Sequence, residues 1–253
     1  MSLTAIAGLP ITKAADQPTQ VNMLIYGESG TGKTTLAGSS DSVPEMRKVL
    51  VIDIEGGVLS LKNRYPDVET IRVKTWESMQ EVYNQLSVGD HEFNTIVIDS
   101  LSEAQKMSMD RIMRKLVEQY PEREETVPQI REWNINIEQT RKFVRLFRDL
   151  PVTTIFTALS REDRNPMRGT IRRKPFLSGK VSDEVAGFLD IVVYLYTKEV
   201  DEQLARVLLC GSTEDTVAKD RTDKLPFTIE NPTMPMIWDL IKGTNLDAAE
   251  RTA

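Results

Sequence analysis

The stretch GESGTGKT at residues 27–34 decides the fold of this chain, because it fits the pattern G-x-x-x-x-G-K-[ST] and follows an apolar run at residues 21–26. A glycine-rich turn between a strand and a helix points successive backbone N–H groups inward, and the helix adds its positive N-terminal dipole. We therefore expect an ATP pocket in which Lys33 reaches the β- and γ-phosphates and the Thr34 hydroxyl ligates Mg²⁺. The predicted nucleotide contacts are Gly27, Glu28, Ser29, Gly30, Thr31, Gly32, Lys33, Thr34 and Thr35.

The composition is that of a globular protein. With 253 residues, of which 40% are hydrophobic and 28% charged, the chain can bury a substantial core in one α/β domain. A formal net charge of −6 argues against bulk-charge binding of nucleic acid, so such binding requires a local basic patch. A single cysteine excludes an intramolecular disulfide, and no apolar run reaches the roughly 18 residues of a membrane span. We expect a cytoplasmic protein with no membrane partner.

The apolar runs predict a mostly parallel sheet flanked by helices. Buried strands are expected at 21–26, 48–54, 95–99 and 152–158, a short strand at 70–73, and helices at 76–86, 100–119 and 129–150. Prolines at 120–128 should interrupt the helices. A helix at 182–189 then precedes an antiparallel hairpin of residues 190–196 and 205–210, a strand at 226–229 and a helix at 237–241. We expect a flexible arm at 1–20, a core at 21–242 and a tail at 243–253.

Two carboxylates end buried strands and are candidates for the chemistry at the phosphates. Asp99 closes the run TIVID, as does a Walker B aspartate that holds Mg²⁺ through its water shell. Glu55 follows the strand at 48–54 and could deprotonate the water that attacks the γ-phosphate. Asp53 is the rival for that role. In parallel sheets these strand ends meet at one edge, where ligands bind.

The three segments together resemble the RecA-like P-loop ATPase core, which implies an α/β fold with a mostly parallel sheet and here a C-terminal antiparallel hairpin extension. In that family a glutamate at the end of the second strand is the general base, which the resemblance assigns to Glu55. The family also places a polar sensor at the end of the fourth strand. This chain has Leu159 at that position, with Ser160 and Thr157 as candidate replacements.

A further resemblance concerns AKDRT at residues 218–222, which is similar to the A-K-x-R segment of DnaB-like hexameric helicases. There the lysine and arginine reach the ATP site of the neighbouring subunit. Two residues spaced two apart on an extended chain share one face, as a two-pronged cationic finger requires. The resemblance implies that Lys219 and Arg221 are catalytic in trans, within a homo-oligomeric ring or filament. The alternative is an exposed basic pair in a charged turn.

Residues 161–180 form a basic island in an acidic protein. The segment has almost no periodicity, and its glycines and prolines predict an irregular loop. Its place after the fourth strand corresponds to the DNA-binding loop of RecA-like recombinases. Arginine forks suit phosphates and a phenylalanine ring can stack on a base. The predicted nucleic-acid contacts are Arg164, Arg168, Arg172, Arg173, Lys174 and Phe176. A solvated charged loop or a subunit contact is the alternative.

With a length close to that of a bare ATPase core, the chain resembles the core-only RecA-like ATPases of bacteriophages, including the Sak-type single-strand annealing proteins. This implies a Mg²⁺-dependent ATP hydrolase that binds single-stranded DNA and supports annealing or recombination in the host cytoplasm, with a single-strand-binding protein as a candidate partner. One alternative is a phage motor or assembly ATPase acting on a protein. The other is a P-loop small-molecule kinase.

Overall fold

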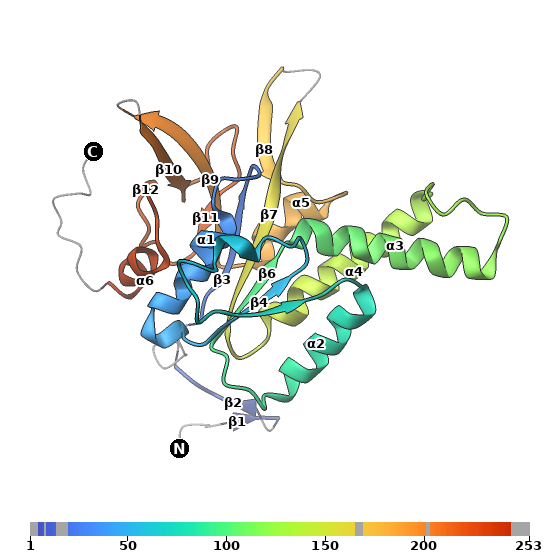
Figure 1. Cartoon of the computed structure of the whole chain (residues 1–253), viewed down its shortest axis with the longest axis horizontal. Helices are drawn as coiled ribbons and strands as arrows, with labels where there is room; N and C mark the ends of the chain where they lie inside the picture. The colour runs from blue at the N-terminus through green and yellow to red at the C-terminus, as the bar shows by residue number, and fades with distance from the viewer. Residues whose placement is uncertain (1–4, 8, 14–19, 165–168, 201–202, 244–253) are drawn as a thin grey trace.

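A computed structural model describes residues 5–7, 9–13, 20–164, 169–200 and 203–243. Its centre is a ten-stranded sheet in the order β12-β10-β9-β3-β7-β6-β4-β5, with β11 paired to β9 and β8 paired to β7 (Figure 1). The strands are β3 (Asn22–Gly27), β4 (Val49–Asp53), β5 (Glu69–Arg72), β6 (Thr95–Asp99), β7 (Thr153–Arg164), β8 (Ile171–Pro175), β9 (Ile191–Val200), β10 (Gln203–Leu209), β11 (Lys219–Asp220) and β12 (Thr228–Glu230). A separate pair joins β1 (Ala5–Ile6) to β2 (Leu9–Pro10) within the predicted arm.

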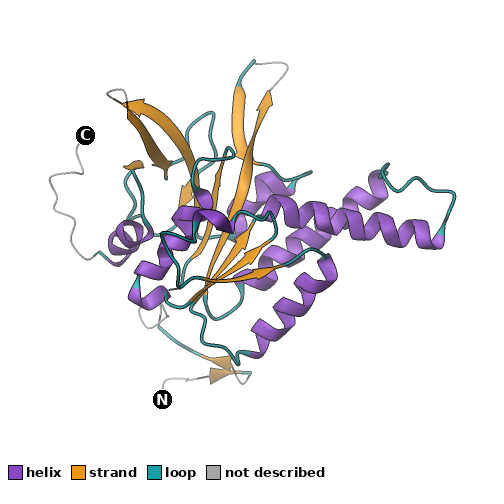
Figure 2. Ribbon diagram, viewed as in Figure 1, coloured by secondary structure: helices purple, strands orange, loops and turns teal. Residues whose placement is uncertain are grey.

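Helices cover both faces of the sheet (Figure 2). They are α1 (Lys33–Gly38), α2 (Trp76–Val88), α3 (Leu101–Gln119), α4 (Ile130–Arg148), α5 (Val181–Phe188) and α6 (Met234–Lys242), with short 3-10 turns at Ser39–Ser42, Pro44–Met46 and Val58–Ser60. No helix in the described ranges is long and apolar enough to cross a membrane. The predicted α/β architecture, a mostly parallel sheet with antiparallel C-terminal strands, is confirmed.

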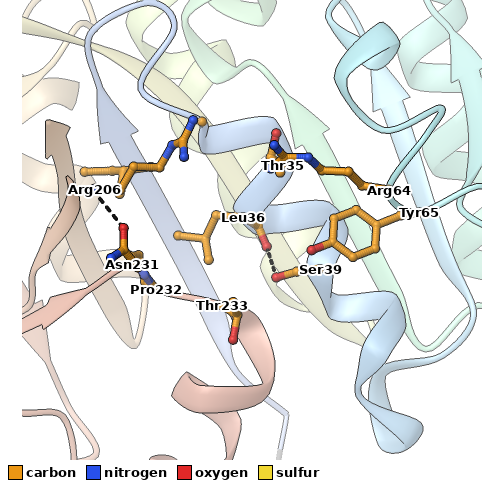
Figure 3. Close-up of a pocket in the computed structure, with 11 residues that line it drawn as sticks. Thr35, Leu36, Ser39, Arg64, Tyr65, Arg206, Asn231, Pro232 and Thr233 are labelled. Carbon is orange, nitrogen blue, oxygen red and sulfur yellow. Dashed lines mark hydrogen bonds between the residues drawn. The ribbon is translucent and has the colours of Figure 1, made fainter. Parts of the chain in front are cut away.

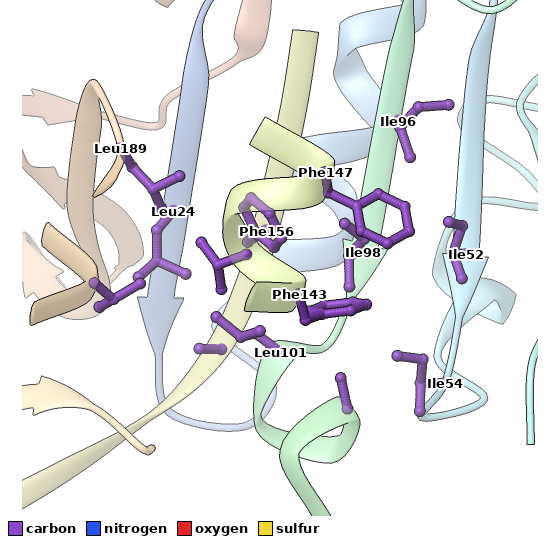
Figure 4. Packing of buried hydrophobic residues seen from close by; sticks show 14 of the residues in the cluster. Leu24, Ile52, Ile54, Ile96, Ile98, Leu101, Phe143, Phe147, Phe156 and Leu189 are labelled. Atoms are coloured by element: carbon purple, nitrogen blue, oxygen red, sulfur yellow. The ribbon is translucent and has the colours of Figure 1, made fainter. Parts of the chain in front are cut away.

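Alternation along the central strands divides the core into two layers. Successive side chains of a strand point to opposite faces, so Leu24 and Tyr26 pack in one layer while Met23 and Ile25 pack in the other. The first layer lies under α2 to α5, where Phe143 and Phe147 of α4 meet the strands (Figure 4). The second layer lies under α1 and α6. Burial on both faces explains why these strands read as continuous apolar runs.

The strand register brings the polar strand ends to one edge of the sheet. In the parallel pairs, Gly27 lies opposite Leu159 and Asp53 lies opposite Asp99. Ser100 caps α3, as predicted, because its hydroxyl accepts a hydrogen bond from the Glu103 N–H at 3.4 Å. The carboxyl ends of β3, β4 and β6 and the end of the buried half of β7 therefore lie next to one another at the same edge of the sheet.

The prediction of an irregular loop at residues 161–180 is wrong. β7 continues to Arg164 beyond the body of the sheet and pairs antiparallel with β8, so the segment projects as a hairpin (Figure 1). In its register Glu162 lies opposite Arg173 and Asp163 lies opposite Arg172. Cross-strand pairs of opposite charge stabilise antiparallel strands, which is why a segment without apolar periodicity still forms them.

Candidate functional site

The P-loop joins the carboxyl end of β3 to the first turn of α1. Gly30 and Gly32 have φ of 80° and 100°, which residues with a side chain rarely adopt. The Thr31 hydroxyl donates to the Glu28 carbonyl at 2.9 Å and holds the turn closed. The motif predicted from sequence therefore has the strand, turn and helix that an anion nest requires.

Lys33 is buried against this turn. Its Nζ donates hydrogen bonds to the carbonyl oxygens of Gly27 at 3.1 Å and Glu28 at 2.8 Å. Burial lowers the pKa of this ammonium, while the charges of Glu55 and Asp99 oppose the shift. Since both of these hydrogen bonds go to neutral carbonyls, phosphate oxygens could replace them at a gain in electrostatic energy.

Two predicted metal contacts meet directly. The Thr34 hydroxyl donates to Oδ2 of Asp99 at 2.7 Å, and the Thr157 hydroxyl donates to Oδ1 of the same carboxylate. A Cβ added at Gly57 would lie 3.6 Å from Asp99 Oδ2 and 3.7 Å from Thr34 Oγ1, so the glycine leaves space beside both oxygens. Oxygen donors with adjoining space for water suit Mg²⁺, for which phosphates and waters would complete the coordination.

The two carboxylates that compete for the role of general base have different partners. Asp53 is buried and accepts from Arg72 at 2.8 Å and from the N–H groups of Gly56 and Gly57 at 2.6 and 3.2 Å. Glu55 is exposed, and its Oε1 accepts a hydrogen bond from the Ser100 hydroxyl. The bonds of Asp53 hold the turn that follows β4. Glu55 is exposed and therefore accessible to a water molecule.

A cleft of about 160 Å³ runs along the outer side of α1 and contains residues that the motifs do not predict. Figure 3 shows Arg206 and Asn231 on one side of the helix and Arg64 and Tyr65 on the other. The Arg206 Nε donates to the Thr31 carbonyl at 3.0 Å and lies against Gly32. The Asn231 side chain accepts a hydrogen bond from the backbone N–H of Arg206 at 3.2 Å and so holds strand β10 in place.

Sequence reasoning missed these residues because they are far from the P-loop in the chain. Arg206 belongs to β10, in the antiparallel extension, and is separated from Thr31 by 175 residues. The available signal was a lone arginine between apolar residues in the strand QLARVLL. Gly57 had a signal too, because the pair Gly56-Gly57 follows Glu55 directly.

The AAA domain family matches residues 19–222. The chain belongs to this family. Among curated proteins, none matches the sequence. A similar solved structure is a KaiC-like protein of the hyperthermophilic archaeon Pyrococcus horikoshii OT3, with 15% identity, a TM-score of 0.45, and coverage of 79% of this chain and 82% of that chain. Membership of the AAA domain family, with the P-loop strand β3 beside β7 in the sheet, agrees with the predicted RecA-like P-loop class.

Lys219 and Arg221 lie at the amino ends of the central parallel strands, whereas the P-loop lies at the carboxyl ends. β11 pairs with Ile191 and Val192 at the start of β9, which in turn runs parallel to the start of β3. Lys219 Nζ donates to the carbonyls of Ala186 and Leu189 at 2.7 and 2.9 Å, and Arg221 donates to Asp190 at 2.6 Å. These hydrogen bonds hold both side chains against residues 186–190, at the end of the parallel strands opposite to the P-loop.

The hairpin cations divide into exposed and paired groups. Arg164 and Arg172 are exposed, whereas Arg173 bridges Glu162 and Asp215, each at 3.0 Å. Lys174 pairs with Asp163 at 2.5 Å and Asp183 at 3.1 Å, and only 9% of its side chain is exposed. Arg173 and Lys174 were both predicted to contact nucleic acid, and a phosphate that binds either of them must first displace these carboxylates. Arg168 lies outside the described residues.

Proposed function

We propose that this AAA domain protein is a Mg²⁺-dependent ATPase. The observation that carries the proposal is the convergence of Thr34, Asp99 and Glu55 beside the buried Lys33. Lys33 would neutralise the β- and γ-phosphates, while Thr34 and Asp99 would hold Mg²⁺, which supplies charge neutralisation when bound. Glu55 would take the proton of the attacking water, and Ser100 orients its carboxylate.

The cleft beside α1 supports ATP as the nucleotide ligand. Phosphates seated in the P-loop would leave the ribose and base along Thr35 and Leu36, in the direction of Tyr65. Arg206 lies between the P-loop and the cleft beside α1, so its guanidinium can contact either the phosphate oxygens or the ribose. A small-molecule kinase would need an acceptor pocket beyond the γ-phosphate. The contacts favour hydrolysis because they place an accessible carboxylate, Glu55, near the metal ligands.

For the macromolecular partner we propose single-stranded DNA, and a role in annealing or recombination of the phage type that the sequence resemblance implies. Support comes from the projecting hairpin, on which Arg164 and Arg172 are exposed, and from Phe176, which is 41% exposed. Forked guanidinium groups and an exposed ring suit a phosphate backbone with unstacked bases. A motor or assembly ATPase that grips a protein with this hairpin is the second candidate.

The decisive experiment measures ATP turnover with and without Mg²⁺, and with and without single-stranded DNA. The ATPase proposal predicts turnover that chelation of the metal abolishes, and the DNA proposal predicts a rise in turnover with the oligonucleotide. Absence of turnover at saturating MgATP contradicts the first proposal. Turnover and binding that both ignore DNA contradict the second and favour a protein partner.

We also propose that Lys219 and Arg221 act in trans in a homo-oligomer. Their distance from their own P-loop fits this role, although contact with a neighbour must displace the bonds to Ala186, Leu189 and Asp190. Mixing inactive Lys33→Ala subunits with inactive Arg221→Ala subunits should restore part of the activity at mixed interfaces. A protein that is monomeric at full activity contradicts this proposal.

A further inference from the structure

A second cavity, of about 570 Å³, lies between the β7–β8 hairpin and the β9–β10 hairpin, which project at the same side of the molecule (Figure 1). Glu162 and Arg173 line it from the first hairpin, and Tyr194 and Tyr196 line it from the second. The P-loop residue Glu28 lines it as well. Cavities of a few hundred Å³ are of the size in which proteins hold a ligand or the side chains of a partner.

One wall of this cavity is a series of tyrosine rings. Tyr194 and Tyr196 lie on the same face of β9, with ring centroids 5.6 Å apart and ring planes 16° apart. Tyr26 continues the series at 5.1 Å from Tyr194, and its hydroxyl donates to the Val217 carbonyl at 2.5 Å. These contacts hold the rings in place before any ligand arrives. Phe227, which is 59% exposed, adds apolar surface to the lining.

The hydroxyl of Tyr194 is an accessible polar group without a partner. Only 9% of this residue is exposed, yet its hydroxyl reaches the cavity and forms no hydrogen bond with any residue that the structure describes. Burial raises the pKa of this phenol, Arg173 opposes the shift, and the carboxylates of Glu28 and Glu162 add to it. The hydroxyl therefore stays neutral and can accept a hydrogen bond from a donor that enters the cavity.

The charges that line the cavity are mostly negative. Arg173 donates to Glu162 and to Asp215, each at 3.0 Å, so one cation is shared by two carboxylates. Glu28 is exposed and forms no ion pair within the described part of the chain. Three carboxylates and one guanidinium leave the lining with a formal charge of −2. The cavity should therefore repel phosphate and attract a cation.

We propose that this cavity receives an arginine side chain of a protein partner. A guanidinium is a planar cation, so it can stack on Tyr196, the last ring of the series, while it donates to the Glu28 carboxylate and the Tyr194 hydroxyl. A metal ion or a polyamine would leave Phe227 without an apolar contact. A polypeptide segment supplies that contact through the residues beside its arginine, which is why a protein fits the lining better than a free cation.

This surface is separate from the proposed DNA contacts. Arg164 and Arg172 are exposed on the outer part of the β7–β8 hairpin, whereas Glu162 and Arg173 line the cavity at its base. A phosphate backbone along the outer part and an arginine at the base would each meet charges of the opposite sign. The inference thus adds a protein partner to the proposed function and does not depend on DNA binding.

The test measures binding of a fluorescein-labelled peptide, with two arginines spaced by glycines, to the full chain at low salt. The comparison peptide carries citrulline in place of both arginines, which keeps a planar group but removes its charge. We expect the arginine peptide to bind at least about tenfold more tightly, because charge-assisted hydrogen bonds are the stronger ones. Tyr196→Leu should weaken its binding by about 2- to 30-fold. Tyr194→Phe, which keeps the ring and loses the acceptor, should weaken it by about 2- to 10-fold.

Glu28→Gln and its matched control decide whether the cavity or the net charge attracts the peptide. Glu28→Gln should remove most of the difference between the arginine and citrulline peptides. Glu199→Gln removes the same charge from an exposed position on β9 outside the cavity, so this variant should bind like the wild type. Thermal melts of each variant confirm that the protein compared is folded.

Three results would overturn the proposal. The first is equal binding of the arginine and citrulline peptides by the wild-type protein. The second is equal weakening by Glu28→Gln and Glu199→Gln, since the peptide would then respond to net charge alone. The third is displacement of the peptide by oligo(dT) together with loss of oligo(dT) binding in Tyr196→Leu, which would assign the cavity to nucleic acid.

Discussion

The P-loop edge and the β7–β8 hairpin both carry cations, but the partners of those cations differ in kind. At the P-loop, Lys33 is hydrogen-bonded to two backbone carbonyls, which are neutral. On the hairpin, Arg173 and Lys174 are bonded to carboxylates. An incoming phosphate can replace carbonyls at Lys33 with a net gain in charge pairing, whereas on the hairpin it must displace a negative charge first. A phosphate site therefore forms at a lower cost at Lys33 than at Arg173 or Lys174.

The largest effect should come from the carboxylates at the P-loop edge. Glu55→Gln should lower the rate of ATP hydrolysis by about 10²- to 10⁴-fold while nucleotide binding persists, because the amide keeps the size but cannot take a proton. Asp53→Asn should instead lower the melting temperature, because it weakens the ion pair to Arg72. Single-turnover kinetics and thermal melts separate the two effects. An inactive Asp53→Asn protein of normal stability beside a fully active Glu55→Gln would reverse the assignment.

A second effect concerns the space beside the metal ligands. Gly57→Val should raise the Mg²⁺ concentration for half-maximal ATP turnover by about 10- to 100-fold, since its side chain enters the space beside Asp99 Oδ2 and Thr34 Oγ1. The backbone there has φ of −88°, which valine tolerates, so the fold should persist. Titration of Mg²⁺ at fixed ATP measures the effect, with Gly187→Ala in α5 as the control, because a Cβ added there meets nothing within 4 Å. An unchanged Mg²⁺ requirement would place the metal elsewhere.

The smallest effects should separate the two kinds of hairpin cation. Removing Arg164 or Arg172 should flatten the dependence of log affinity for single-stranded DNA on log salt by about 0.7 each. Arg173→Ala should leave that slope unchanged and cost about 0.2–1 kcal/mol of folding stability, because its pairs with Glu162 and Asp215 are partly exposed. Equal slope changes for all three variants would show that the carboxylates do not neutralise Arg173.

The sequence predicted those site residues that follow one another within a single strand and the turn after it. The P-loop is one such case, because its glycines, lysine and threonine follow one strand. Asp99 is another, because an apolar strand ends in it. Thr157 was a candidate sensor on the same reasoning, and it contacts Asp99.

The remaining parts depend on contacts between segments that the sequence does not order. Arg206 reaches Thr31 only because β10 joins the sheet two strands from β3. The hairpin was missed because its pairing is carried by opposite charges rather than by apolar alternation. Its signal was the acidic pair Glu162 and Asp163, which lies opposite Arg173 and Arg172 in the hairpin.

The measurement that tests the central claim most directly compares ATP turnover by Lys33→Ala with that of Lys62→Ala, an exposed lysine outside the P-loop. The account predicts that Lys33→Ala keeps the circular dichroism and melting behaviour of a folded protein and loses turnover by about 10²-fold or more, because the buried charge opposite the phosphates is gone. Lys62→Ala should hydrolyse ATP like the wild type. A folded Lys33→Ala protein that hydrolyses MgATP at the wild-type rate would contradict the assignment of this edge as the ATPase site.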